Sequence, residues 1–260
     1  MNKPAAVFLD SGIGGLPYLA WVKNQRPNLA VSYLADTAHF PYGELSSSRI
    51  IQAAAEAAQL IQARLNPSLI AVVCNTASVN ALEEIRRTVS CPVVGTVPAV
   101  KPAAQESSTK PIGILATQGT VNSPYLNSLI AAYAPHREIV RAAAGDIVRY
   151  VEEDWLDDSG IGARDVMQRA LGILKQAEVE TVVIGCTHFL HVAEIIQDML
   201  GGVRLIDSRE GVGRRILSLL DESSPVSGED HFYVSRSAAG MDRYRRFAEL
   251  YGLKWMGELT

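Results

Sequence analysis

The chain has 260 residues, of which 48% are hydrophobic and 20% charged, and its formal net charge is −4. These values are ordinary for a soluble globular protein, and the length suffices for one large domain or two moderate ones. The negative charge and the lack of a Lys/Arg block argue against nucleic acid or an anionic membrane as the main partner. We expect neither a membrane span nor a signal peptide, because polar residues and glycines interrupt every apolar run early.

The first half of the chain alternates runs of β-branched and apolar residues with amphipathic segments, which is typical of parallel α/β construction. This pattern predicts strands over 5–10, 31–36, 69–74 and 92–97. It predicts helices over 17–25, 47–65 and 81–89, the first of them after the glycine-rich turn SGIGG.

The second half has the same alternation. Strands are predicted over 111–117, 138–144, 181–186 and 203–208, and helices over 123–134 and 163–176. The strand-like run HFYVS (231–235) is expected to join an edge of the first domain's sheet, and a terminal helix should follow it.

The two halves also resemble each other in detail. VFLDSGIGGLPYL and GILATQGTVNSPYL both read as a strand, a glycine-bearing loop and a Pro-Tyr-Leu step into a helix. Such repeats usually mean repeated structural units. We therefore predict two similar parallel-sheet α/β domains in a pseudo-twofold arrangement, with an active site in the cleft between them. The first domain should comprise 1–97 and 208–260, and the second 98–207.

Two cysteines occupy matching positions in these halves, Cys74 in LIAVVCNTAS and Cys186 in TVVIGCTHF. A cysteine between a strand end and a helix N-terminus is where a thiolate is most easily stabilised. The alternative, that both are packed core residues, explains one such cysteine well but two in the same frame poorly. We interpret Cys74 and Cys186 as a matched catalytic pair.

The remaining cysteine, Cys91, precedes a proline at a strand start and is interpreted as a core residue. Three cysteines without a CxxC motif, and five scattered histidines, predict a reduced, cytoplasmic protein with no disulfide scaffold and no metal site.

Several polar residues near the strand ends are further candidates. Asp10 begins DSGIGG, which lacks the spacing of a dinucleotide fingerprint; it is interpreted as a catalytic or ammonium-binding group or as a simple N-cap. Asn75 and Thr76 are either caps or ligands of a substrate carboxylate. His188 follows Cys186 closely enough to lower the pKa of the thiol or to carry a proton.

Two further segments are less specific. The loop ADTAHFPYG (35–43) predicts a structured turn whose N–H groups can face a ligand. VEED (151–154) on its own indicates only a solvated helix face.

Taken together, the chain resembles the glutamate racemases of the aspartate/glutamate racemase superfamily. The matching segments are FLDSGIGGL, ADTAHFPYG, VVCNTASVNALEEIR, the start of GILATQGTV, VEED and VIGCTHF, in the family's order. The resemblance implies catalysis without metal or cofactor by the thiols of Cys74 and Cys186. It implies substrate contacts at Asp10, Ser11, Tyr42, Gly43, Asn75, Thr76, Thr187 and His188. Its assisting glutamate falls in VEED, where Glu152 is preferred to Glu153.

The implied reaction is the interconversion of L- and D-glutamate, with D-glutamate supplied for peptidoglycan precursors. Removing a proton from one face of Cα and delivering one to the other needs two groups that exchange base and acid roles, and cysteines suit both. Three alternatives stay open: racemisation of aspartate or of a hydantoin, a decarboxylase or isomerase using one thiol, and a non-catalytic protein that binds acidic metabolites. The oligomeric state is not set by the sequence, and a homodimer is left open.

Overall fold

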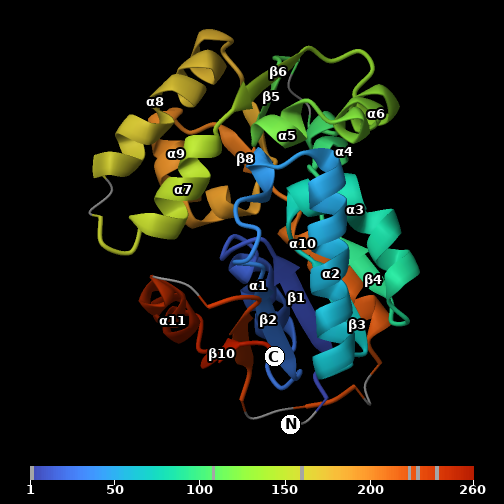
Figure 1. Cartoon of the computed structure of the whole chain (residues 1–260). Coiled ribbons are helices and arrows are strands. Elements are labelled where there is room, and N and C mark those ends of the chain that lie inside the picture. The colour runs from blue at the N-terminus through green and yellow to red at the C-terminus, as the bar shows by residue number, and fades with distance from the viewer. Residues whose placement is uncertain (1–2, 107–108, 159–160, 222–223, 227–228, 238–239) are drawn as a thin grey trace. The chain divides into compact units, whose positions relative to one another are not determined.

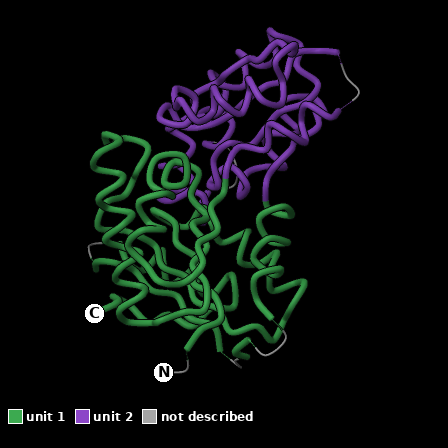
Figure 2. Tube along the Cα trace, turned by 90° about the vertical axis from the view of Figure 1, so that its right-hand side faces the viewer, with its two compact units in different colours: residues 1–96, 209–260 green, residues 97–208 purple. Residues whose placement is uncertain are grey.

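The computed structural model describes residues 3–106, 109–158, 161–221, 224–226, 229–237 and 240–260 (Figure 1). Its contacts divide the chain into two compact units (Figure 2). Unit 1 comprises Met1–Thr96 and Arg209–Thr260, and unit 2 comprises Val97–Ser208. Each unit is built on its own parallel sheet with helices, as the alternating sequence pattern predicted.

The sheet of unit 1 has six strands in the order β10-β9-β2-β1-β3-β4, and every pairing in it is parallel. The strands are β1 (Ala6–Asp10), β2 (Val31–Ala35), β3 (Leu69–Val72), β4 (Val93–Gly95), β9 (His231–Val234) and β10 (Lys254–Glu258). All residues of β1, β2 and β3 are buried. Strands covered on both faces read as continuous apolar runs, which is why the sequence revealed them.

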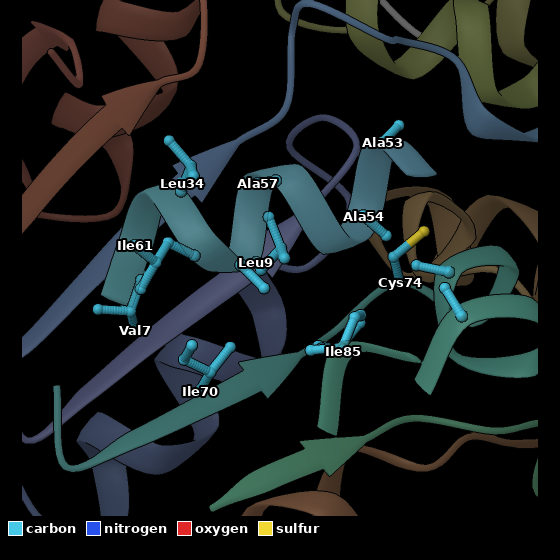
Figure 3. Packing of buried hydrophobic residues seen from close by; sticks show 14 of the residues in the cluster. Val7, Leu9, Leu34, Ala53, Ala54, Ala57, Ile61, Ile70, Cys74 and Ile85 are labelled. Atoms are coloured by element: carbon cyan, nitrogen blue, oxygen red, sulfur yellow. The ribbon is translucent and has the colours of Figure 1, made fainter. Parts of the chain in front are cut away.

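Helices pack against this sheet, and their buried side chains form the hydrophobic core of unit 1 together with those of the strands. They are α1 (Leu16–Gln25), α2 (Ser47–Leu65), α3 (Asn75–Thr88), α10 (Arg209–Leu219) and α11 (Met241–Leu250). The buried face of α2 is rich in alanine, including Ala53, Ala54 and Ala57, so this helix can lie close to β1 and β3 (Figure 3). In α3 the buried residues Ala77, Ala81 and Ile85 recur every four positions and give the helix one apolar face.

Unit 2 has four parallel strands in the order β6-β5-β7-β8. They are β5 (Ile112–Ala116), β6 (Ile139–Ala143), β7 (Thr181–Ile184) and β8 (Arg204–Ile206). Its helices are α4 (Val100–Ala104), α5 (Gln118–Val121), α6 (Pro124–Tyr133), α7 (Gly145–Glu153), α8 (Ile161–Gln176) and α9 (Ala193–Met199). Buried side chains of β5, α4 and α6 share one core cluster.

The C-terminal part of unit 1 differs from the prediction. The run 231–235 joins the sheet beside β2, but its expected place at the edge is wrong because β10 pairs with its other side. The sequence did not reveal β10 because its register shifts between Trp255 and Gly257, where the glycine has φ +79°. A bulge of this kind breaks the alternation by which strands are recognised.

The helix predicted over 81–89 also begins earlier than expected. It starts at Asn75, directly after Cys74, so the polar residues that follow this cysteine form its first turn. Within the described ranges, no helix is long and apolar enough to cross a membrane.

Candidate active site

The candidate residues of unit 1 gather at the carboxyl ends of its three central strands. Asp10 is the last residue of β1, Asp36 directly follows β2, and Cys74 lies two positions after β3. Because β2, β1 and β3 are neighbours in a parallel sheet, these ends share one edge. Ligands of open α/β sheets bind at this edge.

Cys74 is the N-cap residue of α3 and belongs to the core cluster of unit 1 (Figure 3). Its backbone carbonyl accepts a hydrogen bond from the Ser78 N–H at 2.9 Å. Its Sγ lies 3.9 Å from the Ser11 hydroxyl. The positive end of a 14-residue helix favours negative charge at this sulfur.

Asp10 organises the turn between β1 and α1. Its Oδ1 accepts hydrogen bonds from the Gly12 N–H at 2.8 Å and from the Ser11 hydroxyl at 3.4 Å. The N-cap of α1 is Gly15, so the interpretation of Asp10 as a simple cap of this helix is wrong. Asp10 instead holds Ser11 beside the thiol of Cys74.

The same turn is packed tightly against the strand that leads to Cys74. A Cβ atom added at Gly15 would lie 2.3 Å from Val73 Cγ2, so only glycine fits here. The buried hydroxyl of Tyr33 accepts from the Gly15 N–H at 3.1 Å and donates to the Gly12 carbonyl at 2.9 Å. Tyr33 thus stabilises the turn through two hydrogen bonds, a role that its place in an apolar strand did not reveal.

Tyr42 lies in the short 3₁₀ helix η1 (Tyr42–Glu44), and its phenol is buried. The phenol donates to Asp36 Oδ2 at 2.5 Å. Burial, and then the charge of Asp36 and this hydrogen bond, raise the pKa of Tyr42 well above its usual value, with smaller effects from Cys74 and Asp10. The phenol therefore keeps its proton at neutral pH.

Tyr42 and Gly43 also present free backbone donors. Neither N–H group forms a hydrogen bond within the part of the chain that the structure describes. The resemblance assigned substrate contacts to both residues, and two adjacent N–H groups of this kind suit a carboxylate.

Asn75 is the first residue of α3, and its side chain is only 3% exposed. Neither Oδ1 nor Nδ2 of its amide has a hydrogen-bond partner among the described residues. The alternative that Asn75 caps the helix is wrong, since Cys74 holds the N-cap position and Asn75 makes no cap bond. A buried polar group without a partner costs about 1–3 kcal/mol, so this amide points to a ligand.

In unit 2, Cys186 lies two positions after β7 and is the N-cap of the 3₁₀ helix η2 (Thr187–Val192). The thiol and the following Thr187 and His188 are buried. The residue before the thiol must be small, because a Cβ atom at Gly185 would lie 2.8 Å from Ala116 Cβ. The central strands β5 and β7 therefore fix the position of Cys186.

Cys186, His188 and Glu152 form a chain of contacts. His188 Nδ1 lies 4.0 Å from Cys186 Sγ, and His188 Nε2 lies 2.9 Å from Glu152 Oε1. A carboxylate on one ring nitrogen orients an imidazole and stabilises its protonated form, which leaves the other nitrogen for the thiol.

The acidic run 151–154 divides into two kinds of residue. Glu152, on α7, is 1% exposed, whereas Glu153 and Asp154 are exposed. The interpretation of this run as a solvated helix face holds for Glu153 and Asp154 but is wrong for Glu152. Of the two adjacent glutamates, the structure brings Glu152 to His188.

The described residues contain no group of three or more His, Cys, Asp and Glu side chains that could hold a metal ion.

These features agree with a comparison to known proteins. A family model described as Asp/Glu/Hydantoin racemase matches residues 20–210. The chain belongs to this family.

Individual members of the racemase family match nearly the whole chain. The glutamate racemase of Treponema pallidum (strain Nichols) is 39% identical over 255 residues, which cover 97% of this chain and 95% of the relative. That of Shewanella baltica (strain OS223) is 36% identical over 250 residues, covering 95% of this chain and 89% of the relative. A crystal structure of Escherichia coli glutamate racemase with L-glutamate and the activator UDP-MurNAc-Ala has a TM-score of 0.89 and 30% identity, covering 100% and 99% of the two chains.

Within this racemase fold, sequence reasoning missed Tyr33, Asp36 and Ser235. Asp36 had a signal, since it lies in the ADTAHFPYG segment as the last residue of a predicted strand. Ser235 had none, because its hydrogen bond to Asp36 joins positions 199 residues apart.

Proposed function

We propose that this racemase interconverts L- and D-glutamate, with Cys74 and Cys186 as the two groups that move the Cα proton. The names of its relatives support glutamate as substrate. The observation that carries the two-thiol mechanism is that each cysteine follows a central strand and contacts its own proton-handling neighbours. These are Ser11 for Cys74, and His188 with Glu152 for Cys186.

In the proposed reaction one cysteine acts as thiolate and removes the proton from Cα, becoming a thiol. The other cysteine, a thiol at the start, delivers its proton to the opposite face and becomes the thiolate. In the reverse direction the roles exchange. The family resemblance associates Cys74 with D-glutamate and Cys186 with L-glutamate.

The carbanion formed between the two transfers needs stabilisation, because the Cα hydrogen of an amino acid is weakly acidic. We assign the substrate carboxylates to the free N–H groups of Tyr42 and Gly43 and to the unpartnered amide of Asn75. The hydroxyls of Ser11, Thr76 and Thr187 complete the donors, and Asp10 is a candidate partner of the ammonium group. Donors fixed by the fold stabilise developing charge without having to reorient.

The proposal includes no metal or cofactor and places the enzyme in the cytoplasm, supplying D-glutamate for peptidoglycan precursors. All three cysteines are free, which suits a reducing compartment. Two thiols of this kind have to remain reduced to exchange protons.

Circular dichroism of each enantiomer of glutamate and of aspartate, incubated separately with the enzyme, tests the function. After dialysis against chelator with a reductant, both glutamate signals should decay to zero, and the aspartate signals should persist. Decay of the aspartate signals alone would make the chain an aspartate racemase. Activity that is lost on dialysis and restored by zinc or pyridoxal phosphate would contradict the cofactor-free mechanism.

A further inference from the structure

Asp36 is a buried carboxylate that gathers three hydrogen-bond donors. It is 1% exposed, and Oδ2 accepts from the Tyr42 phenol at 2.5 Å and from His39 Nδ1 at 2.9 Å. Oδ1 accepts from the Ser235 hydroxyl at 2.5 Å. Burying a carboxylate is unfavourable unless hydrogen bonds compensate for the lost water. The three donors therefore stabilise Asp36 in its buried position.

These donors tie the loop 36–43 to a distant part of the chain. His39 and Tyr42 belong to the loop itself, whereas Ser235 follows β9 and is 199 positions away from Asp36. The Ser235 hydroxyl also accepts from the Ala38 N–H at 3.0 Å. Thr37 adds a second tie, since its hydroxyl donates to the Arg236 carbonyl at 2.6 Å and accepts from the Arg236 N–H at 3.2 Å.

The backbone of Asp36 connects the same loop to the sheet edge formed by the carboxyl ends of β2, β1 and β3. Its N–H donates to the carbonyl of Asp10 at 2.8 Å, and its carbonyl accepts from the His39 N–H at 3.2 Å. The Tyr42 ring, held by the carboxylate, packs in the core cluster that contains Cys74. Asp36 therefore binds the loop both at His39 and at Tyr42, the residue that carries the first of the two free N–H groups.

We propose that Asp36 is a positioning residue, which holds the Tyr42–Gly43 N–H groups and the Tyr42 ring in the geometry needed to bind the substrate carboxylate beside Cys74. The kinetic part of this inference rests on the proposed racemisation of glutamate. The fold holds the substrate carboxylate in the same way before and during proton transfer, so this contact contributes uniform binding. Its loss raises KM and leaves kcat nearly unchanged. Partial unfolding does the opposite, since it lowers the apparent kcat at constant KM.

The chain offers a matched control at the other end of the same strands. Asp230 directly precedes β9, and its carboxylate accepts from the Val31 N–H at 3.0 Å and pairs with Lys23 at 2.6 Å. It thus ties β2 to the C-terminal segment as Asp36 does, but at the amino ends of the strands, away from the thiol.

The test compares Asp36→Ala, Asp36→Asn and Asp230→Ala in the full chain. Hydrogen–deuterium exchange of peptides covering 37–43 should be faster in both Asp36 variants and unchanged in Asp230→Ala. The KM for both glutamate enantiomers should rise about tenfold in Asp36→Ala and less in Asp36→Asn, with kcat within about threefold of wild type. Melting temperatures measured alongside correct for the folded fraction, and Asp36→Asn keeps the side-chain shape if Asp36→Ala does not fold.

Unchanged loop exchange in folded Asp36 variants would overturn the positioning role, whether or not the enzyme racemises glutamate. Faster exchange with an unchanged KM, or a KM rise equal to that of Asp230→Ala, would reduce Asp36 to a structural residue. A wild-type enzyme without glutamate racemisation would contradict the proposed function alone, and the exchange comparison would still decide the role of Asp36.

Discussion

The two thiols occupy equivalent places but have different neighbours. Cys74 is the N-cap of a long helix and has the Ser11 hydroxyl at 3.9 Å, with Asp10 holding that hydroxyl. Cys186 is the N-cap of a short 3₁₀ helix and has an imidazole at 4.0 Å, supported by the buried Glu152. The repeated strand-and-turn scaffold therefore sets where each thiol lies, and the residues around it set how its proton is managed.

A racemase does not require symmetric catalysts, because the two enantiomers have equal free energy. The equilibrium constant of one fixes kcat/KM to be equal in both directions, whatever surrounds each thiol. Differences between the two thiols therefore appear in kcat and KM separately, in isotope effects and in exchange of the Cα hydrogen. The following changes are expected to expose these differences, from the largest effect to the smallest.

The largest effect should come from removing either thiol. Cys74→Ala and Cys186→Ala should each lower racemisation in both directions by about 10⁴-fold or more, the upper end for a general acid–base group. Cys91→Ala is the control, since this partly buried cysteine packs against the core, and its activity should stay close to wild type. Racemisation rates by circular dichroism measure all three, and near-normal activity in a Cys74 or Cys186 variant would refute the pair.

Removing the imidazole beside Cys186 should come next. His188→Asn should lower kcat by about 10²–10⁴-fold, more strongly in the L-to-D direction, in which Cys186 is the proposed base. Asp10→Asn should slow the D-to-L direction more, because Asp10 belongs to the surroundings of Cys74. Separate kcat and KM values for each direction check the asymmetry. Wild-type rates in both variants would mean that these residues only shape the turns.

The carboxylate behind the imidazole should have a smaller effect. Glu152→Gln keeps the shape but weakens the support of protonated His188, so kcat should fall by about tenfold or more. Glu153→Gln is the matched control, because this neighbouring side chain is exposed and its loss should leave the rates unchanged. Equal effects of the two substitutions would contradict the chain of contacts from Glu152 to Cys186.

The smallest effect is expected at Ser11. Ser11→Ala removes the hydroxyl beside Cys74 but leaves the helix N-terminus and Asp10 in place, so kcat should fall only a few-fold, in the range of one neutral hydrogen bond. Steady-state kinetics in both directions measure it. A loss as large as that of His188→Asn would show that the hydroxyl is the main proton-handling neighbour of Cys74.

The sequence revealed the strands before both cysteines because buried parallel strands are continuous apolar runs with sharp ends. It also contained a usable signal for Glu152. On a helix this residue lies one turn after the buried Val148, whereas Glu153 lies one turn after the exposed Arg149. The resemblance to a family, not this spacing, led to the preference for Glu152.

Other parts of the site could not be predicted because they depend on tertiary contacts. The hydrogen bond of Asp36 to Ser235 joins residues that no local pattern relates, and the role of Tyr33 follows only from the turn above its hydroxyl. The register shift in β10 kept the sequence pattern from revealing this strand, which pairs with β9. The pseudo-twofold arrangement of the domains and the cleft between them stay predictions of the sequence.

The central claim, that each thiol serves one face of Cα, is tested most directly by solvent exchange in D₂O followed by NMR. A lone thiol can reprotonate only the face from which it took the proton, and it delivers a deuteron there once its own S–H has exchanged with D₂O. Cys186→Ala should therefore exchange the Cα hydrogen of D-glutamate without forming L-glutamate, and Cys74→Ala should do the same for L-glutamate. Exchange of the same enantiomer by both variants, or inversion by either, would contradict the account.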